Sequence, residues 1–338
     1  MTSREPRLDR SYMLNFVGDW GGANIHRMCS WLCQEFCARA GTTSRVAIWS
    51  IRGGGIEAIH EVQDGQADLC IMTPAALLRL ALEGRGLFRS RPTPSLRALA
   101  VLPQDDRMVL ALSPGLGIGS FEELRRKRPP LRIAASRDDG TNFIGYVGRL
   151  LMQAHGLDEA TLRSWGGCYV EDTHPRESLE RMRAGTVDAV LQEAIMTPWW
   201  AQLIEGGKAV PLPAEAGALA SLASDYGLHS GVLPAGYWDG LATELPALDF
   251  SDFLVMVRDD MPEEVAHLLT WCLVETRDTL ERQYRHLPAR RSPVTHPIEP
   301  SRMARAPIPL HPGAQRYYRE AGLLAGAQAD DSGRSVPR

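Results

Sequence analysis

The chain contains 338 residues, and its 37 Lys and Arg against 41 Asp and Glu give a formal net charge of −4. This length predicts two domains rather than one. The weakly acidic charge, without a basic stripe interleaved with aromatic residues, argues against nucleic acid as a partner. No apolar run approaches the length needed to cross a bilayer, so direct membrane insertion is not expected.

The first ten residues bear on the location of the protein. Residues 1–10 are charged and lack the apolar segment of a secretory signal, which predicts a cytoplasmic protein. The alternative is a periplasmic protein whose signal was removed or whose start is misassigned.

Two units of strand, glycine turn and helix open the chain. Residues 12–18 read as a strand that runs into Gly21-Gly22, and residues 46–51 read as a strand that runs into Gly53-Gly54-Gly55. Glycine turns at the carboxyl ends of neighbouring parallel strands converge on one crevice, where open α/β sheets bind ligands. The free N–H groups of the helices that follow attract an anion. We therefore expect one wall of a ligand site here.

A second set of such units follows. Residues 131–135 read as a strand that enters the polar turn 136–142 and then a helix. The segment Gly65-Gln-Ala-Asp68 has a counterpart in Gly185-Thr-Val-Asp188, and a Met-Thr-Pro sequence follows each of them. The pattern predicts two doubly wound α/β lobes around a central ligand cleft.

The lobes are expected to exchange the chain twice. Hinges are predicted near 111–114, where Ser-Pro-Gly breaks the chain, and near 247–252. Residues 248–257 read as one long strand, and a helix follows it to about Tyr284. The predicted boundaries are 1–112 for the first part of lobe 1, 113–250 for lobe 2, 251–325 for the return to lobe 1 with the C-terminal helices, and 326–338 for a disordered tail.

The sequence carries no recognisable catalytic or metal-binding motif. Its nine histidines form no dyad, and we find no nucleophile elbow, Walker loop or His-Glu-x-x-His sequence. Cys29, Cys33 and Cys37 recur every four residues, which is typical of one face of a helix packed on a core. A metal site that includes His26 is the alternative, although the spacing matches no common zinc pattern. We expect no metal, no cofactor and no enzymatic activity.

Several segments resemble the TAXI-type solute-binding proteins of TRAP transporters. The most specific is the C-terminal Pro-Leu-His-Pro-Gly-Ala-Gln-Arg-Tyr-Tyr-Arg-Glu-Ala-Gly at 309–322. The glycines at 53–55 followed by Gly-Gln-Ala-Asp-Leu at 65–69 match that family's Gly-Gly-Ser and Gly-Glu-Ala-Asp-Leu segment. Ser-Phe-Glu-Glu-Leu-Arg-Arg-Lys-Arg at 120–128 and Asp-Gly-Thr at 139–141 match its second lobe. The resemblance spans roughly residues 12–322.

The resemblance implies a type II periplasmic-binding-protein fold. In that fold two lobes close on a small ligand, usually a carboxylate such as glutamate, and pass it to membrane subunits driven by an ion gradient. The sequence departs from the family at residues 18–22, because Gly-Asp-Trp-Gly-Gly replaces a loop that is almost all glycine and threonine. The family's usual ligand is therefore not carried over. By position, the pocket loops are expected at 18–24, 49–55, 72–74, 136–142 and 193–199.

Candidate ligand-binding residues in these loops divide by chemistry. Arg52 and Arg137 are expected to clamp carboxylate oxygens from the two lobes, with an ion pair to Asp138 or Asp139 as the alternative. Asp19 and Glu193 are placed to receive a ligand ammonium, or are simply solvated. The remaining candidates are the hydroxyl groups of Thr73 and Thr197, the stacking walls Trp20, Trp49, Trp199 and Trp200, the backbone at Gly21, Gly53 and Gly54, and Thr141 and Asn142, which bind ligand or cap a helix.

The sequence therefore predicts a solute-binding protein that captures a small carboxylate-bearing ligand, namely an amino acid, a dicarboxylate or an aromatic acid. TRAP membrane subunits are the partners that the resemblance implies. The alternative is a cytoplasmic ligand sensor or enzyme that uses the same fold.

Overall fold

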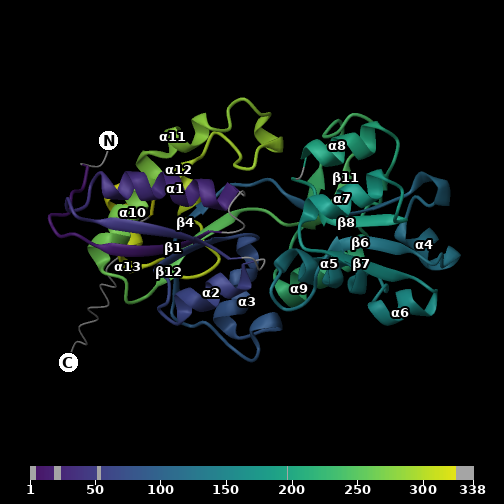
Figure 1. Cartoon of the computed structure of the whole chain (residues 1–338), viewed down its shortest axis with the longest axis horizontal. Helices are drawn as coiled ribbons and strands as arrows, with labels where there is room; N and C mark the ends of the chain where they lie inside the picture. The colour runs from purple at the N-terminus through teal and green to yellow at the C-terminus, as the bar shows by residue number, and fades with distance from the viewer. Residues whose placement is uncertain (1–4, 19–23, 52–54, 196, 325–338) are drawn as a thin grey trace, which may run out of the picture.

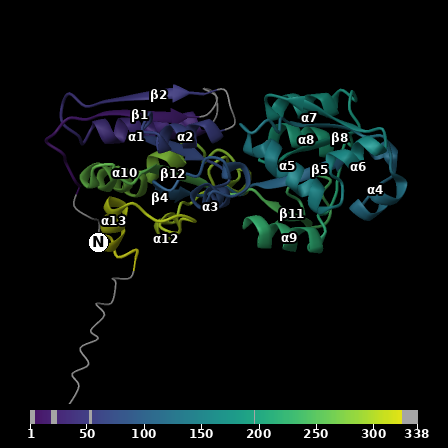
Figure 2. The ribbon, with the colours of Figure 1, turned by 90° about the horizontal axis from the view of Figure 1, so that it is seen from below.

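The computed structural model describes residues 5–18, 24–51, 55–195 and 197–324, and this part of the chain forms two lobes placed side by side (Figures 1 and 2). The predicted tail 326–338 lies outside the described residues. Lobe 1 is built on a sheet with the strand order β2-β1-β3-β12-β4. Its strands are β1 (Met13–Gly18), β2 (Arg45–Ser50), β3 (Leu69–Met72), β4 (Leu96–Leu102) and β12 (Phe253–Arg258).

Helices cover both faces of this sheet because its strands are apolar on both sides. In β3, Leu69 and Ile71 face one hydrophobic core, while Cys70 and Met72 face the other. The helices of the first core are α1 (Asn24–Cys37), α10 (Glu263–Glu275), α11 (Arg277–Arg282), α12 (Pro300–Met303) and α13 (Pro312–Glu320). Those of the second are α2 (Ile56–Gln63) and α3 (Leu78–Glu83), with the short turns η1 (Ala75–Leu77) and η2 (Gly86–Phe88).

Lobe 2 follows the same plan around a second sheet, with the order β10-β11-β5-β8-β6-β7 and β9 paired to β5. Its strands are β5 (Arg107–Leu112), β6 (Arg132–Ser136), β7 (Cys168–Asp172), β8 (Ala189–Glu193), β9 (Val210–Pro211), β10 (Ser230–Leu233) and β11 (Leu245–Asp249). Its helices are η3 (Pro114–Leu116), α4 (Phe121–Lys127), α5 (Phe143–Ala154), α6 (Glu159–Ser164), α7 (Pro175–Arg183), α8 (Thr197–Glu205) and α9 (Ala216–Tyr226). The architecture confirms the predicted pair of α/β lobes.

The chain crosses between the lobes at 103–106, from β4 to β5, and returns at 250–252, from β11 to β12. The crossings run side by side, since Phe250 N donates to Asp106 O (3.1 Å) and Asp252 N donates to Gln104 O (3.1 Å). The apolar run 248–257, predicted as one strand, is therefore two strands in different sheets. Asp252 has a φ of 66°, and this left-handed residue bends the chain between them.

The first crossing differs from the hinge expected near 111–114 and from the lobe boundary at 112. β5 pairs with β8 and β11 of lobe 2, so the break that follows it is a turn within lobe 2. The return crossing lies inside the expected range 247–252.

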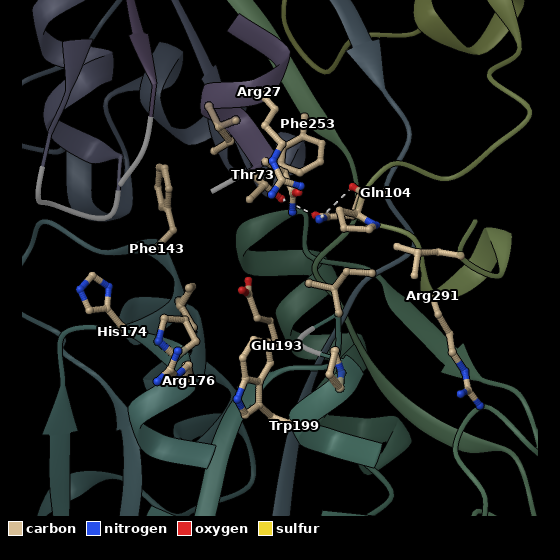
Figure 3. A pocket seen from close by; sticks show the side chains of 18 of the residues that line it. Arg27, Thr73, Gln104, Phe143, His174, Arg176, Glu193, Trp199, Phe253 and Arg291 are labelled. Atoms are coloured by element: carbon tan, nitrogen blue, oxygen red, sulfur yellow. Dashed lines mark hydrogen bonds between the residues drawn. The ribbon is translucent and has the colours of Figure 1, made fainter. Parts of the chain in front are cut away.

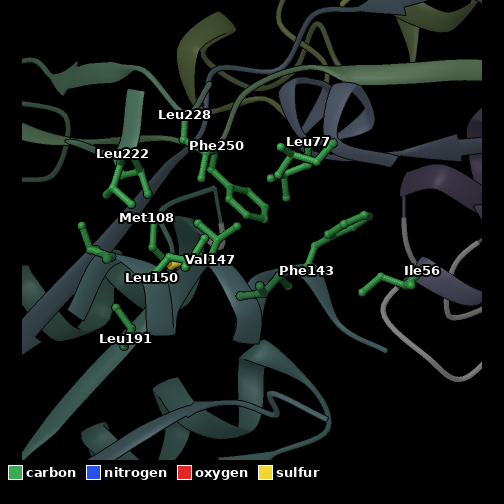
Figure 4. Close-up of a cluster of buried hydrophobic side chains, with 14 of the residues drawn as sticks. Ile56, Leu77, Met108, Phe143, Val147, Leu150, Leu191, Leu222, Leu228 and Phe250 are labelled. Carbon is green, nitrogen blue, oxygen red and sulfur yellow. The ribbon is translucent and has the colours of Figure 1, made fainter. Parts of the chain in front are cut away.

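A hydrophobic core continues from one lobe into the other (Figure 4). It joins Ile56 and Leu77 of lobe 1 to Phe143 and Leu222 of lobe 2, with Phe250 of the return crossing in the same cluster. Polar contacts border this core: Ile56 N donates to Thr141 O (3.4 Å), and Arg85 Nη2 donates to Asp225 O (2.7 Å). The lobes are therefore in contact beside the cleft.

No helix of the described ranges has both the length and the apolar character needed to cross a membrane.

Lobe 2 contains a histidine that the fold holds neutral. His155, at the C-terminal end of α5, is 2% exposed and stacks on Phe121 with ring centroids 3.7 Å apart. Its Nδ1 donates to Leu151 O (2.7 Å), because a carbonyl can only accept, and its Nε2 accepts from Glu215 N (2.9 Å). Burial lowers the pKa of His155.

Acid is therefore expected to weaken lobe 2. The unfolded state, with a histidine pKa of about 6.5, binds more protons than the fold, so the stabilisation is complete above that pH and is lost as the pH falls through the lower folded pKa. His155→Gln should lower the free energy of unfolding by about 1–3 kcal/mol at pH 8 and flatten the pH dependence. Urea denaturation of both proteins at pH 8 and pH 5 measures this. An identical pH dependence in the two proteins would contradict it.

Candidate ligand site between the lobes

A cavity of about 980 Å³ lies between the lobes (Figure 3). Lobe 1 contributes the start of α1, the end of β3, the first crossing and the segment 287–293, which contains η4 (Ala289–Arg291). Lobe 2 contributes the starts of α5, α7 and α8 and the end of β8. The volume is at the upper end of the range typical of small-molecule sites, about 300–1,000 Å³.

Helix N-termini converge on this cavity. Within the described part of the chain, α1, α5, α7 and α8 each place residues of their first turn in its lining. Local sequence explains two of these starts: Asn142 Oδ1 accepts from Ile144 N (2.8 Å) as the cap of α5, and Pro175 opens α7 behind a capping box of His174 and Glu177. The positive ends of the helix dipoles therefore face the cavity.

Charged side chains of both signs line the cavity, namely Arg27, Arg176 and Arg291 with Glu177, Glu180 and Glu193. Arg27, in the first turns of α1, lies on the lobe 1 side near Tyr284. Burial raises the pKa of Tyr284, and the Arg27 guanidinium partly opposes this effect. On the lobe 2 side, Arg176 Nε pairs with Glu180 Oε1 (2.8 Å) and its guanidinium lies 5.9 Å from the centroid of the Trp199 ring. Arg291 Nη2 donates to Gly236 O (3.2 Å), which links the 287–293 segment to lobe 2.

Two carboxyl groups form an acidic region on the lobe 2 side. Glu193 is the last residue of β8 and is 9% exposed. Its carboxylate points from lobe 2 into the cavity, toward Thr73 and Arg27 on the lobe 1 wall (Figure 3). Asp106 is fully buried, and its Oδ1 accepts from Arg107 N (2.6 Å) and from Ile195 N (2.9 Å). Burial, and then the neighbouring Glu193 carboxylate, raises the pKa of Asp106 well above its usual range. The backbone N–H donors act in the opposite direction.

The rest of the lining is mainly apolar. Phe143 and Trp199 come from lobe 2, and Phe253 comes from the start of β12 in lobe 1 (Figure 3). Aliphatic and proline side chains fill the spaces between them: Ile25, Met72, Ile144, Ile195, Leu287, Pro288 and Pro293. Such a lining suits a ligand with an apolar body and few polar groups.

Three of the residues singled out from the sequence line the cavity: Trp199 and the strand-end residues Thr73 and Glu193. Thr73 Oγ1 donates to Gln104 Oε1 (3.2 Å), and Gln104 Nε2 donates to Pro293 O (3.5 Å), so this hydroxyl belongs to a network joining lobe 1 segments. Thr73 and Glu193 each lie at the carboxyl end of a strand, which is where the sequence predicts ligand contacts.

Other predicted residues that the structure describes are outside this lining. Trp49 is 58% exposed and its Nε1 donates to Asn15 Oδ1 (3.0 Å). Arg137 is exposed, and Thr141 donates to Asp139 Oδ1 through its backbone N (3.1 Å) and its Oγ1 (2.6 Å). Asn142 caps α5.

The remaining candidates cannot be placed in this way. Thr197 opens α8, and its side chain lies outside the described residues. Also outside the described residues are Asp19, Trp20, Gly21, Arg52, Gly53 and Gly54.

Sequence reasoning missed several residues of the lining. Arg27 lies in α1, beyond the predicted loop 18–24, and His174 to Arg176 follow the end of β7. Residues 174–176 could have been predicted, because β7 pairs in parallel with β6 and the carboxyl ends of parallel strands face the ligand cleft. No local signal marks Gln104 or the 287–293 segment.

The cysteine stripe belongs to the core of lobe 1. Cys29 is buried, and Cys33 and Cys37 are half-buried against the same cluster. Burial raises the pKa of Cys29 to about 12 and that of Cys33 to about 11, which keeps both thiols protonated at neutral pH. Within the described ranges, no group of three or more His, Cys, Asp or Glu could hold a metal ion.

Two α/β lobes, joined by paired crossings and enclosing a cavity, define the type II periplasmic-binding-protein class. The chain belongs to the NMT1-like family, whose family model matches residues 31–322. A search of curated proteins finds no match.

Solved structures confirm the fold class. MatC from Rhodopseudomonas palustris, solved with bound malate, is 13% identical with a TM-score of 0.51, over 92% of this chain and 97% of MatC. A protein from Bordetella bronchiseptica RB50 is 13% identical with a TM-score of 0.50, over 95% of this chain and 92% of that protein.

Proposed function

We propose that this protein is a solute-binding protein that captures a small carboxylate-bearing ligand between its lobes. The observation that carries the proposal is the interlobe cavity on which the N-terminal turns of α1, α5, α7 and α8 converge. Helix N-termini favour anions through their dipoles and their N–H groups. Arg27 adds a guanidinium on the lobe 1 wall, which can bind a carboxylate through two hydrogen bonds.

Closure of the lobes is the mechanism that this site supports. A ligand held by Arg27 of lobe 1 and by the helix ends of lobe 2 contacts both lobes at once, so its binding favours the closed arrangement. The paired crossings at 103–106 and 250–252 are where the chain would bend.

Ligand capture should be visible as thermal stabilisation. A carboxylate at 100 times its Kd should stabilise the protein by about 2.7 kcal/mol, which a thermal-shift screen of amino acids, dicarboxylates and aromatic acids detects as a higher Tm. The amide of each hit is the matched ligand that lacks the anion. Arg27→Gln should weaken carboxylate binding roughly tenfold, the loss expected for a charged hydrogen bond. Arg126→Gln, on the exposed face of α4, is the control variant.

The proposal fails if no carboxylate raises the Tm. It also fails if the amides stabilise the protein as strongly as the acids, because the cavity would then not recognise the negative charge.

The role proposed for the closed form is delivery of the ligand to TRAP-type membrane subunits from the periplasm. The resemblance of residues 309–322 to the TAXI signature supports this. Fractionation of the native cells, followed by affinity purification from the membrane fraction, tests it. Recovery from the cytoplasm alone, without a membrane partner, would favour an intracellular ligand sensor instead.

A further inference from the structure

The charges around the cavity are not evenly distributed. On the lobe 2 rim Arg176 is paired with Glu180 (2.8 Å), and the Glu177 carboxylate accepts from His174 N in the α7 capping box (3.3 Å). These groups are therefore engaged with one another. Glu193 lies deeper, at the end of β8, with its carboxylate directed into the cavity opposite the Arg27 wall (Figure 3).

Asp106 lies close behind Glu193, and burial together with the Glu193 carboxylate raises the pKa of Asp106 well above its usual range, which favours its protonated form. The Asp106 side chain does not line the cavity. It lies behind the lining, because its Oδ1 accepts a hydrogen bond from the backbone N of the lining residue Ile195 (2.9 Å). Its Oδ2 is buried and has no hydrogen-bond partner among the residues that the structure describes. Because the two carboxyl groups are neighbours, a positive charge placed beside them would offset the repulsion between their ionised forms.

The apolar lining favours a ligand that also has a large apolar group. Phe143, Trp199 and Phe253 surround a space of about 980 Å³, far more than a ligand of only a few atoms would fill. An aromatic or large aliphatic group there would remove apolar surface from water, at roughly 25 cal/mol per Å².

We infer that Glu193 is a specificity-determining residue that binds the ammonium group of the ligand, and that the preferred solutes are amino acids with a large apolar or aromatic side chain. The inference rests on the proposed function, in which the carboxylate binds near Arg27 and the helix ends. A dicarboxylate is disfavoured because its second carboxylate would approach the Glu193 carboxylate, and like charges repel in a site shielded from water.

Three probes separate the groups of such a ligand: L-phenylalanine, 3-phenylpropanoate, which lacks the amine, and 2-phenylethylamine, which lacks the carboxylate. Calorimetric titration of the full chain should give L-phenylalanine at least roughly tenfold tighter binding than 3-phenylpropanoate, since a hydrogen bond between charged groups is involved. Succinate should bind more weakly than L-phenylalanine.

Substitutions of the acidic residues test whether Glu193 causes the preference for L-phenylalanine over 3-phenylpropanoate. Glu193→Gln keeps the size and one acceptor oxygen but removes the charge, and it should bring the ratio of the two affinities close to one while 3-phenylpropanoate still binds. Asp106→Asn should keep the preference for L-phenylalanine, because its amide oxygen can keep both backbone hydrogen bonds and Glu193 remains in place. Glu122→Gln, the same change at an exposed position of α4, should leave the ratio unchanged.

The outcomes distinguish this inference from the proposed function. Equal binding of L-phenylalanine and 3-phenylpropanoate to the wild type, or an unchanged ratio in Glu193→Gln, overturns the role of Glu193 while carboxylate capture stands. Binding of succinate but not L-phenylalanine overturns the solute class in the same way. Binding of 2-phenylethylamine without either acid supports the ammonium site and overturns carboxylate capture. If no probe and no carboxylate binds, both proposals fail.

Discussion

Replacing Phe250 by alanine is expected to lower the free energy of unfolding by about 3–5 kcal/mol, the range for a buried Phe→Ala change. Phe250 is fully buried in the return crossing and belongs to the core that joins the lobes. In Figure 4 it lies between Leu222 of lobe 2 and Leu77 of lobe 1. Removing the ring leaves a cavity that neither lobe can fill alone, because each is fixed by its own sheet.

Urea denaturation with and without a bound carboxylate measures this effect. Phe250→Leu is the matched control and should lose less than about 1.5 kcal/mol, since it keeps most of the apolar volume. If the alanine and leucine variants lost equally little free energy of unfolding, the Phe250 ring would not be needed to hold the two lobes together. Small-angle scattering of the alanine variant should also show a larger radius of gyration, because the contact that holds the lobes together is weakened.

The second large effect is expected at Gly145, in the first turn of α5. A Cβ atom there would lie 1.7 Å from Arg137 O and 2.9 Å from Asp138 N. These are backbone atoms of the loop between β6 and α5, so no side-chain rotation can relieve the overlap. Gly145→Ala should therefore lower the free energy of unfolding by roughly 3 kcal/mol or more, at the upper end for overpacking.

The same substitution at Gly217, in the first turn of α9, is the control. A Cβ atom at Gly217 would meet nothing within 4 Å, and alanine is the better helix former by about 1 kcal/mol. Gly217→Ala should therefore be neutral or slightly stabilising. Comparison of the two denaturation midpoints decides the point: similar midpoints would mean that the 137–138 loop can move away from α5.

Gly145→Ala should also impair ligand capture. Displacing this loop moves the start of α5, which carries the lining residues Phe143 and Ile144. The affinity for any carboxylate found in the thermal-shift screen should fall even below the unfolding transition, whereas Gly217→Ala should keep it.

Local patterns were sufficient for the general plan of the fold. Strand, turn and helix units with apolar strands, such as Leu69–Met72, bury both faces of a sheet and so require helices on each side. The same patterns located Thr73 and Glu193, because the ends of strands are readable from sequence and the ligand edge of a parallel sheet is always the same one.

Patterns could not assign the run 248–257 to its sheets. Leu248 and Val255 have the same apolar character, and β11 and β12 differ only in the partners with which they pair. The left-handed Asp252 that separates them is a weaker turn signal than a glycine, so it indicated a hinge but not a change of sheet. The position of β5 in lobe 2 depended in the same way on its pairing with β8.

The sequence by itself determined the two α/β lobes and the strand ends that face the cleft, since these follow from alternation and turn chemistry within short segments. Only the tertiary structure decided which charges meet there. Arg27, Glu193 and the 287–293 segment come from distant parts of the chain, and contacts such as Thr295 N with Pro103 O (2.8 Å) bring the last of these to the cavity. Such long-range contacts leave no local pattern, because each depends on the packing of both lobes at once.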